Sequence, residues 1–202
     1  MKTVVRLLVV LFAFAAAPVW AADADPLDHA LGQPGAPVTV YEYASLTCPH
    51  CAHFHELVLP RLQADWIGTG KVKLVYRDFP TPPVNMSLAA SVINHCAGPM
   101  RYFGVLSLLF RDQEKWMSAA NPLDEIKRIV RVAGMTSAQV DDCLSHQDVA
   151  KAIQARAEEG NRLLGVDSTP SLVIAGKVMP GLAPYEDITK ALEEAYKAAV
   201  KK

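Results

Sequence analysis

The chain has 202 residues, of which 51% are apolar and 20% are charged. A chain of this size and composition can bury a substantial core, and it fits one domain with room for an insertion. Its formal net charge is −1, and no basic stripe or arginine cluster stands out. Composition therefore argues against a nucleic-acid-binding protein.

Residues 1–22 have the three-part pattern of a secretory signal peptide. Two positive side chains precede an apolar run from Leu7 to Ala17, and Pro18 ends that run. A membrane-spanning helix would need about 20 apolar residues without such an interruption. We predict cleavage after Ala21 or Ala22 and a periplasmic location, where four cysteines tend to pair and three connectivities are open.

The next segment predicts a strand, a helix and a second strand. Residues 23–37 are polar and rich in proline and glycine, which indicates an irregular arm. Val38–Ala44 is β-branched and aromatic, and residues 71–79 alternate in polarity, so both are typical of strands. Between them, residues 52–64 show helical spacing of apolar side chains. This order indicates a βαβ unit with parallel strands.

A helical block is predicted after the second strand. Alanine, leucine, glutamate, lysine and glutamine dominate it, and it contains no β-rich run. Glycine and proline divide the block into separate helices. The expected helices cover residues 85–97, 100–111, 123–133, 137–144 and 148–164.

The C-terminal part predicts a return to the sheet. Residues 171–175 indicate a strand, residues 177–179 a short returning strand, and residues 185–200 a terminal helix. The sequence therefore predicts an α/β fold into which a helical block is inserted. Its predicted parts are a signal peptide (1–22), an arm with the first part of the α/β domain (23–83), the helical insertion (84–164) and the second part of that domain (165–202).

The motif Cys48-Pro49-His50-Cys51 falls where the first strand passes into the first helix. Pro49 suits the first helical position, because the N–H that it lacks would have no partner there. Residues three apart share a helix face, so Cys48 and Cys51 can close a disulfide. The free N–H groups and positive dipole end of the helix would stabilise a thiolate at Cys48, and His50 could add to this effect.

Stabilising that thiolate has a directional consequence. It stabilises the reduced protein, so the oxidised protein becomes a stronger electron acceptor. Each unit of pKa is worth about 1.4 kcal/mol, equivalent to about 30 mV for a two-electron couple. The motif therefore predicts a redox site that could favour oxidation of its substrates.

Other uses of a C-x-x-C pair compete with the redox interpretation. A structural disulfide in so small a ring would be an unusual way to brace a fold. Cys48, Cys51 and His55 would share one helix face, but structural zinc sites usually take ligands from two separate elements. Haem attachment needs a histidine directly after the second cysteine, and Ala52 occupies that position. We therefore expect neither a metal nor a cofactor.

Two features outside the motif fit redox chemistry. Glu42 lies in an otherwise apolar strand, and a buried carboxylate there could relay a proton to or from the second cysteine. The alternative is that Glu42 faces solvent. Thr169-Pro170 directly precedes the third strand, where a proline is tolerated for structural reasons alone.

In combination, these features resemble the DsbA-like thiol:disulfide interchange proteins of the thioredoxin superfamily. The resemblance covers nearly the whole chain after the signal peptide. It rests on Tyr43–Ala52, Arg77–Pro80 and Ser168–Ser171, and the Pro-His dipeptide between the cysteines is its most specific part. It implies a thioredoxin fold with an inserted helical domain.

The resemblance also implies roles for individual residues. Cys48 would be the nucleophile that forms a mixed disulfide with substrate, and Cys51 would resolve it. Pro170 would be a cis proline opposite the disulfide, with the backbone of Thr169 pairing with bound peptide. Glu42 would be the buried acid behind the active site.

A second pair, Cys96 and Cys143, departs from the simplest members of that family. If the motif cysteines form the redox pair, the remaining partnership is between these two residues. Closing a loop of about 48 residues would stabilise the fold by roughly 4 kcal/mol in the chain-entropy model. We expect a structural disulfide, while free buried thiols and a second redox couple remain alternatives.

The function that the resemblance implies is oxidation of newly exported proteins by a monomer. Its substrates would be partly unfolded chains with free thiols, and its reoxidant a DsbB-like, quinone-linked membrane protein. A disulfide isomerase or reductase is the alternative, although such isomerases usually carry an N-terminal dimerisation domain that the short segment before the first strand cannot provide. A periplasmic metal-binding protein is a third hypothesis.

Overall fold

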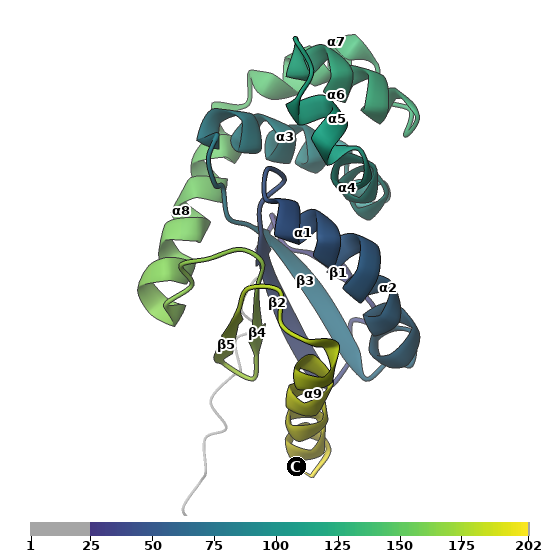
Figure 1. The fold of residues 1–202 in the computed structure, drawn as a ribbon, viewed down its shortest axis with the longest axis vertical. Coiled ribbons are helices and arrows are strands. Elements are labelled where there is room, and N and C mark those ends of the chain that lie inside the picture. Colours follow the sequence, from purple (N-terminus) through teal and green to yellow (C-terminus); the bar gives the residue numbers. More distant parts are fainter. Residues whose placement is uncertain (1–24, 202) are drawn as a thin grey trace, which may run out of the picture.

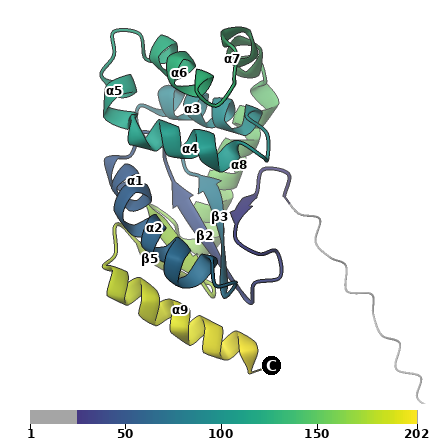
Figure 2. The same ribbon diagram turned by 90° about the vertical axis from the view of Figure 1, so that its right-hand side faces the viewer.

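The computed structural model describes residues 25–201 (Figure 1). The predicted signal peptide, residues 1–22, lies outside the described residues. None of the helices within the described part combines the length and apolar character needed to cross a membrane. The fold is built on one sheet, with a block of helices beyond one end of it and the C-terminal helix near the other end (Figure 2).

The sheet has five strands in the order β1-β3-β2-β4-β5. Strands β2 and β3 are parallel, whereas every other neighbouring pair is antiparallel. The predicted parallel βαβ unit is therefore confirmed. The strands are β1 (His29–Leu31), β2 (Val38–Ala44), β3 (Val72–Asp78), β4 (Ser171–Ile174) and β5 (Lys177–Pro180).

Strand β1 corrects the sequence interpretation, which made the whole arm irregular. His29–Leu31 pairs antiparallel with β3. Three residues are too few to show a strand period, so local sequence carries no signal for this element. Tertiary contacts support it instead: the Asp28 carboxylate accepts hydrogen bonds from Arg77 and Arg156, each at 2.9 Å.

A long helical segment follows β2 and covers one face of the sheet. It consists of α1 (Pro49–His53) and α2 (Leu59–Leu62), with wider π-helical turns at Phe54–Val58 and Gln63–Ile67. The predicted helix over residues 52–64 is confirmed and is longer at both ends. Its apolar side chains share a core with α9 (Tyr185–Val200) and with β2, β3 and β4.

The helical block lies between β3 and β4 in the chain (Figure 1). The helices that the sequence indicated are all present. One further helix, α5, follows α4 after a single residue and was not predicted, because five residues show no clear period. The block consists of α3 (Val84–Cys96), α4 (Tyr102–Arg111), α5 (Gln113–Met117), α6 (Pro122–Arg131), α7 (Ser137–Leu144) and α8 (Gln147–Leu164).

Helix α8 returns the chain from the block to the other face of the sheet (Figure 1). It approaches β2 closely at Gly160, where an added Cβ would lie 2.5 Å from the Tyr43 ring. A side chain at this position would force the buried Tyr43 ring to shift, so glycine allows the close packing of α8 on β2.

Two main cores result, and both motif cysteines pack in the larger one. The sheet core contains residues of β2, β3, β4, α2 and α9. The larger core belongs to the helical block, but it also includes Leu46, Cys51 and Tyr76 from the sheet side. Cys51 is thus enclosed by both parts of the fold.

Candidate active site

The turn between β2 and α1 is held by hydroxyl groups that the sequence reasoning missed. Ser45 Oγ lies 2.9 Å from Ser87 Oγ and 3.0 Å from Thr47 Oγ1, and it accepts a hydrogen bond from the Thr81 backbone N–H at 3.2 Å. These contacts tie the turn to the segment that leads into α3. They fix the backbone directly before Cys48.

Cys48 caps the N-terminus of α1 with an extended backbone, and Pro49 is in the first turn. The backbone N–H groups of Cys51 and Ala52 donate to the Cys48 carbonyl at 3.1 and 3.2 Å. The motif therefore has its first cysteine at the positive end of a helix and its second cysteine one turn later. His50 lies on the exposed side of this turn.

The two thiols differ sharply in exposure. In the structure both cysteines are free thiols; Cys48 is half-buried and Cys51 is completely buried. The hydrogen bond from the Cys51 thiol is the largest cause that lowers the pKa of Cys48, which falls to about 5. Partial burial opposes this change, while Thr169 and the backbone N–H groups of Cys51 and His50 reinforce it.

The pKa of Cys51 moves in the opposite direction. Burial raises it well above its ordinary value, and the neighbouring charges of Cys48 and Glu42 add to the effect. The Ser45 backbone N–H donates to Cys51 Sγ at 3.5 Å and opposes the rise only in part. At neutral pH the pair therefore combines a thiolate at Cys48 with a protonated thiol at Cys51.

The Thr169–Pro170 peptide bond is cis and lies beside the motif. Cys48 Sγ is 3.3 Å from the Thr169 carbonyl oxygen, although 121 residues separate the two. Pro170 is buried directly before β4, and Ser171 Oγ braces the turn by donating to the Ser168 carbonyl at 2.8 Å. The structure thus brings the predicted Thr-Pro pair to the reactive sulfur.

Glu42 is completely buried in the central strand, so the solvent-facing alternative is wrong. It pairs in register with Tyr76 of β3 and Leu172 of β4. Its Oε1 lies 2.9 Å from His55 Nε2, whereas its Oε2 has no hydrogen-bond partner. Sequence reasoning considered His55 only as a possible zinc ligand. A search for partners of a buried acid among nearby helical residues could have found this pair.

Gln113 is a second residue that the sequence reasoning missed. It is the first residue of α5, and its Nε2 donates to the carbonyls of Leu46 and Cys48 at 2.8 and 3.0 Å. Gln113 therefore connects the helical block directly to the cysteine motif. The contact spans 65 residues of sequence, and α5 itself was not predicted.

A pocket of about 570 Å³ opens next to the motif. Pro49 and Ala52 line one side, and Phe110, Gln113 and Met117 line the other. The pocket begins one residue from Cys48, and its lining mixes apolar side chains with polar and charged ones. A polypeptide attached to Cys48 would therefore lie close to it.

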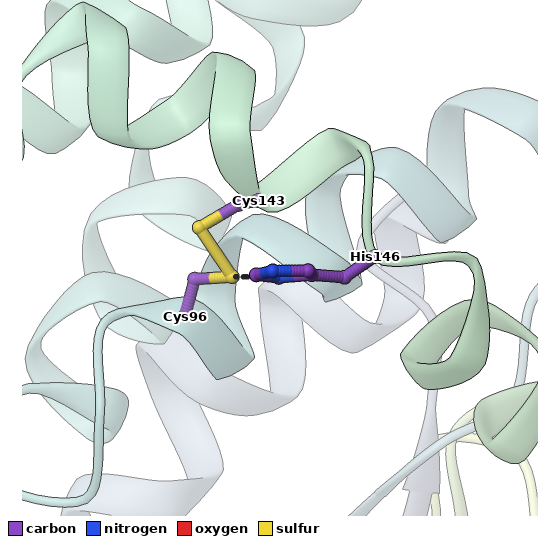
Figure 3. Close-up of side chains that lie close together, drawn as sticks. All are labelled: Cys96, Cys143 and His146. Atoms are coloured by element: carbon purple, nitrogen blue, oxygen red, sulfur yellow. Dashed lines mark hydrogen bonds between the residues drawn. A yellow bond between two sulfur atoms is a disulfide. The ribbon is translucent and has the colours of Figure 1, made fainter.

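The other two cysteines form a disulfide within the helical block (Figure 3). Cys96 ends α3 and Cys143 lies in α7, with 6.0 Å between their Cα atoms. His146, which precedes α8, points its ring at this bond, and its Nδ1 is 3.8 Å from Cys96 Sγ. The three side chains would suit a soft metal, but the disulfide uses both thiolates that such a site would need.

The chain is similar to known proteins in both sequence and fold. A family model described as Thioredoxin matches residues 24–194. A putative protein-disulfide oxidoreductase from Rickettsia bellii is 28% identical over 153 residues, which cover 75% of this chain and 58% of the relative. Disulfide bond formation protein D from Bacillus subtilis is 24% identical over 173 residues, covering 83% and 76%. The chain spans 58–65% of the length of the Rickettsia relatives.

Solved structures match the sheet and the helical block together. The crystal structure of alpha-DsbA1 from Wolbachia pipientis has a TM-score of 0.78 and 26% identity, and it covers 88% of this chain and 94% of that chain. BdbD from Bacillus subtilis has a TM-score of 0.70 at 20% identity, covering 85% and 94%, and is similar in fold. The matches confirm the predicted fold class, a thioredoxin-like sheet with inserted helices.

Proposed function

We propose that this chain, which belongs to the thioredoxin family and is DsbA-like, is a periplasmic thiol–disulfide oxidoreductase that introduces disulfide bonds into exported proteins. The proposal rests mainly on one observation: within a single motif, the pKa of Cys48 is lowered and the pKa of Cys51 is raised. A low pKa at Cys48 and a high pKa at Cys51 give the pair one reactive sulfur and one protected sulfur.

The reaction begins with the oxidised pair. A substrate thiolate attacks Cys48 Sγ, the bond between Cys48 and Cys51 breaks, and its electron pair stays on Cys51, which takes up a proton. The substrate's second thiolate then attacks the substrate sulfur of the mixed disulfide. Cys48 leaves as a thiolate, so the substrate gains a disulfide and the protein keeps the two electrons.

The environment of Cys48 favours this direction. A thiolate of low pKa is a good leaving group, and its stabilisation favours the reduced protein. An oxidase needs both properties, because it must release its product and accept electrons. A reductase must instead favour its own oxidised form. A low pKa at Cys48 opposes this, because it stabilises the reduced protein.

Substrate binding is assigned to the surfaces around Cys48. Thr169 and Pro170 are proposed to hold an extended substrate backbone, since the Thr169 carbonyl already lies beside the reactive sulfur. Pro49 and His50 present the sulfur at the exposed end of α1, and Glu42 is proposed as the buried acid that serves Cys51. The pocket beside Cys48 is proposed to receive a neighbouring substrate side chain.

The cellular partners follow from the same proposal. Substrates are partly unfolded exported chains with free thiols, and a DsbB-like membrane protein linked to quinone returns the pair to its disulfide form. The protein acts as a monomer after removal of residues 1–22. The Cys96–Cys143 bond serves as a structural disulfide in the helical block.

The redox midpoint potential tests the function. It is measured against a glutathione buffer in a Cys96→Ala/Cys143→Ala variant, so that only one couple titrates. We expect a midpoint well above that of thioredoxin, which is about −270 mV. A midpoint at or below that value would contradict the oxidase. Refolding of a scrambled-disulfide substrate then separates oxidase from isomerase, because an oxidase alone leaves the wrong pairs in place.

A further inference from the structure

The proposed reaction requires a proton to move between the buried Cys51 thiol and the solvent. When Cys48 is part of a mixed disulfide, its sulfur can no longer accept the proton of the Cys51 thiol. Cys51 is completely buried, so water cannot reach it directly. The Ser45 backbone N–H that contacts its sulfur is a donor and cannot accept a proton.

Glu42 is the proton acceptor that the structure offers near Cys51. The charge of its carboxylate contributes, after burial and Cys48, to the raised pKa of the Cys51 thiol. Its Oε2 is buried and has no partner, so that oxygen is free to take a proton. However, Glu42 is itself completely buried in the central strand, and it also needs a connection to solvent.

His55 provides a connection between Glu42 and a cavity. Its Nε2 lies 2.9 Å from Glu42 Oε1, and the ring packs against Phe110 with 4.2 Å between ring centroids. The side chain is only 4% exposed, yet it lines a cavity of about 220 Å³ between the α1–α2 segment and α4. The other titratable groups that face His55 are Tyr76 from β3, and Glu56 and Arg111 at the same cavity.

We propose that His55 is the positioning residue that exchanges this proton between Glu42 and the solvent of the cavity. The inference rests on the proposed function, because only a thiol–disulfide exchange protein needs to move a proton at Cys51. It adds a residue that neither the motif nor the Thr-Pro pair supplies.

The proton transfers balance in both halves of the cycle. During reoxidation, Cys51 sulfur attacks Cys48 Sγ of the mixed disulfide, the partner sulfur leaves as a thiolate, and the Cys51 proton passes to Glu42 Oε2. In the same step His55 releases one proton to water at the cavity, and its Nε2–H still donates to Glu42. During substrate oxidation each transfer runs in reverse. The buried pair holds the same number of protons throughout, so no net charge is created in the core.

A two-phase experiment isolates the Cys51 step. Reduced protein is mixed with dithiobis(nitrobenzoate), whose released thiolate absorbs visible light. The first phase reports attack by Cys48, and the second reports attack by Cys51 on the mixed disulfide. We expect His55→Gln to slow the second phase roughly tenfold or more and to leave the first unchanged. Glutamine can still donate to Glu42 but cannot give up a proton.

Two further variants complete the test. His146→Gln, on an exposed histidine that lines neither the pocket beside Cys48 nor the cavity at His55, is the matched control and should leave both phases unchanged. His55→Ala should be slow in the second phase and should recover when imidazole is added, because the cavity can hold that ring. The parent protein should not respond to imidazole.

The outcomes separate the relay from the proposed function. A second phase in His55→Gln within about twofold of the parent would overturn the relay, because hydrogen bonding to Glu42 would then be enough. Equal slowing of both phases, or no recovery of His55→Ala with imidazole, would overturn it as well. A parent protein whose first phase is as slow as that of an ordinary thiol would instead refute the proposed function.

Discussion

The two cysteine pairs of this chain occupy contrasting environments. Cys48 and Cys51 are three residues apart in one helical turn, and one of them reaches the surface. Cys96 and Cys143 are 47 residues apart and join two helices of the inserted block. The first pair has a helix terminus, a cis proline and a buried acid around it, whereas the second has His146 beside it.

This contrast shows that surroundings determine what a cysteine pair can do. A disulfide that closes a long loop removes much conformational freedom from the unfolded chain. One that closes a four-residue turn removes little, so its value lies in the chemistry of its sulfurs. The exposed and buried halves of the motif pair differ in pKa, and that asymmetry is what a redox site needs.

The largest expected difference between the pairs is in catalysis. Cys48→Ser should reduce oxidation of a fluorescent dithiol peptide by roughly a thousandfold or more, because it removes the only attacked sulfur. Cys96→Ala/Cys143→Ala should keep the rate within about threefold of the parent. Stopped-flow fluorescence measures both. If the double variant were as slow as Cys48→Ser, the Cys96–Cys143 pair would have to take part in the reaction.

The second difference should appear in stability. Cys96→Ala/Cys143→Ala should lower the free energy of unfolding by about 2 to 4 kcal/mol, because the unfolded chain regains the freedom that the long loop had lost. Urea unfolding of parent and variant, both with the motif cysteines reduced, measures the change. A loss below about 0.5 kcal/mol would argue against a structural role.

The pH dependence of alkylation sharpens the contrast within the motif. With a pKa of about 5, Cys48 in the reduced protein should react with iodoacetamide at a nearly constant rate above about pH 6. Below pH 5 the rate should fall about tenfold per unit as the thiolate is protonated. Cys51 should stay unmodified, as mass spectrometry can check. A rate that still rises toward pH 9 would contradict the lowered pKa of Cys48.

The same pKa of Cys48 makes the stability of the reduced protein depend on pH. The pKa of Cys48 is lower in the folded than in the unfolded protein, so the thiolate stabilises the folded state. This stabilisation is complete above about pH 9 and is lost as the pH falls through about 5. The oxidised protein has no such thiolate. The stability gap between reduced and oxidised protein should therefore narrow as pH falls from 9 to 5, which urea unfolding of both forms measures.

The smallest expected effect concerns the contact between the helical block and the motif. Gln113→Ala removes the side-chain donor to the Leu46 carbonyl, whereas the Cys48 carbonyl keeps the N–H groups of Cys51 and Ala52. The loss should cost about 1 to 2 kcal/mol of unfolding free energy. Gln147→Ala, at an exposed position of α8, is the control and should change stability by less than about 0.5 kcal/mol. Equal losses of unfolding free energy in both variants would show that the Gln113 contact with the motif does not stabilise the fold.

Most of the fold could be predicted because its long elements carry a local period. β2 was predicted with its observed ends, and α9 was predicted over the same residues, since both show a regular apolar pattern. β1 and α5 were missed because three and five residues are too short for a period to appear. Their positions depend on contacts made elsewhere in the chain.

The same distinction applies to the site. Cys48 and Cys51 could be found because their chemistry lies within one contiguous motif at a strand–helix junction. The Glu42–His55 contact spans 13 residues and joins a strand to a helix, so only folding brings the two side chains together. The position of Pro170 opposite the motif was expected only from a resemblance, and the contact of the Thr169 carbonyl with Cys48 Sγ was not predicted, because nothing in the local sequence indicates it.

The position of Cys51 in the core of the helical block limits how the protein can be redesigned. Its side chain packs in the same cluster as Ile93, Leu106 and Leu109, which all come from the inserted helices. A shortened protein that kept only the sheet would leave this sulfur uncovered, as a second nucleophile competing with the first. The insertion is therefore not a detachable module, and a minimal redox scaffold derived from this chain would need a new cover for Cys51.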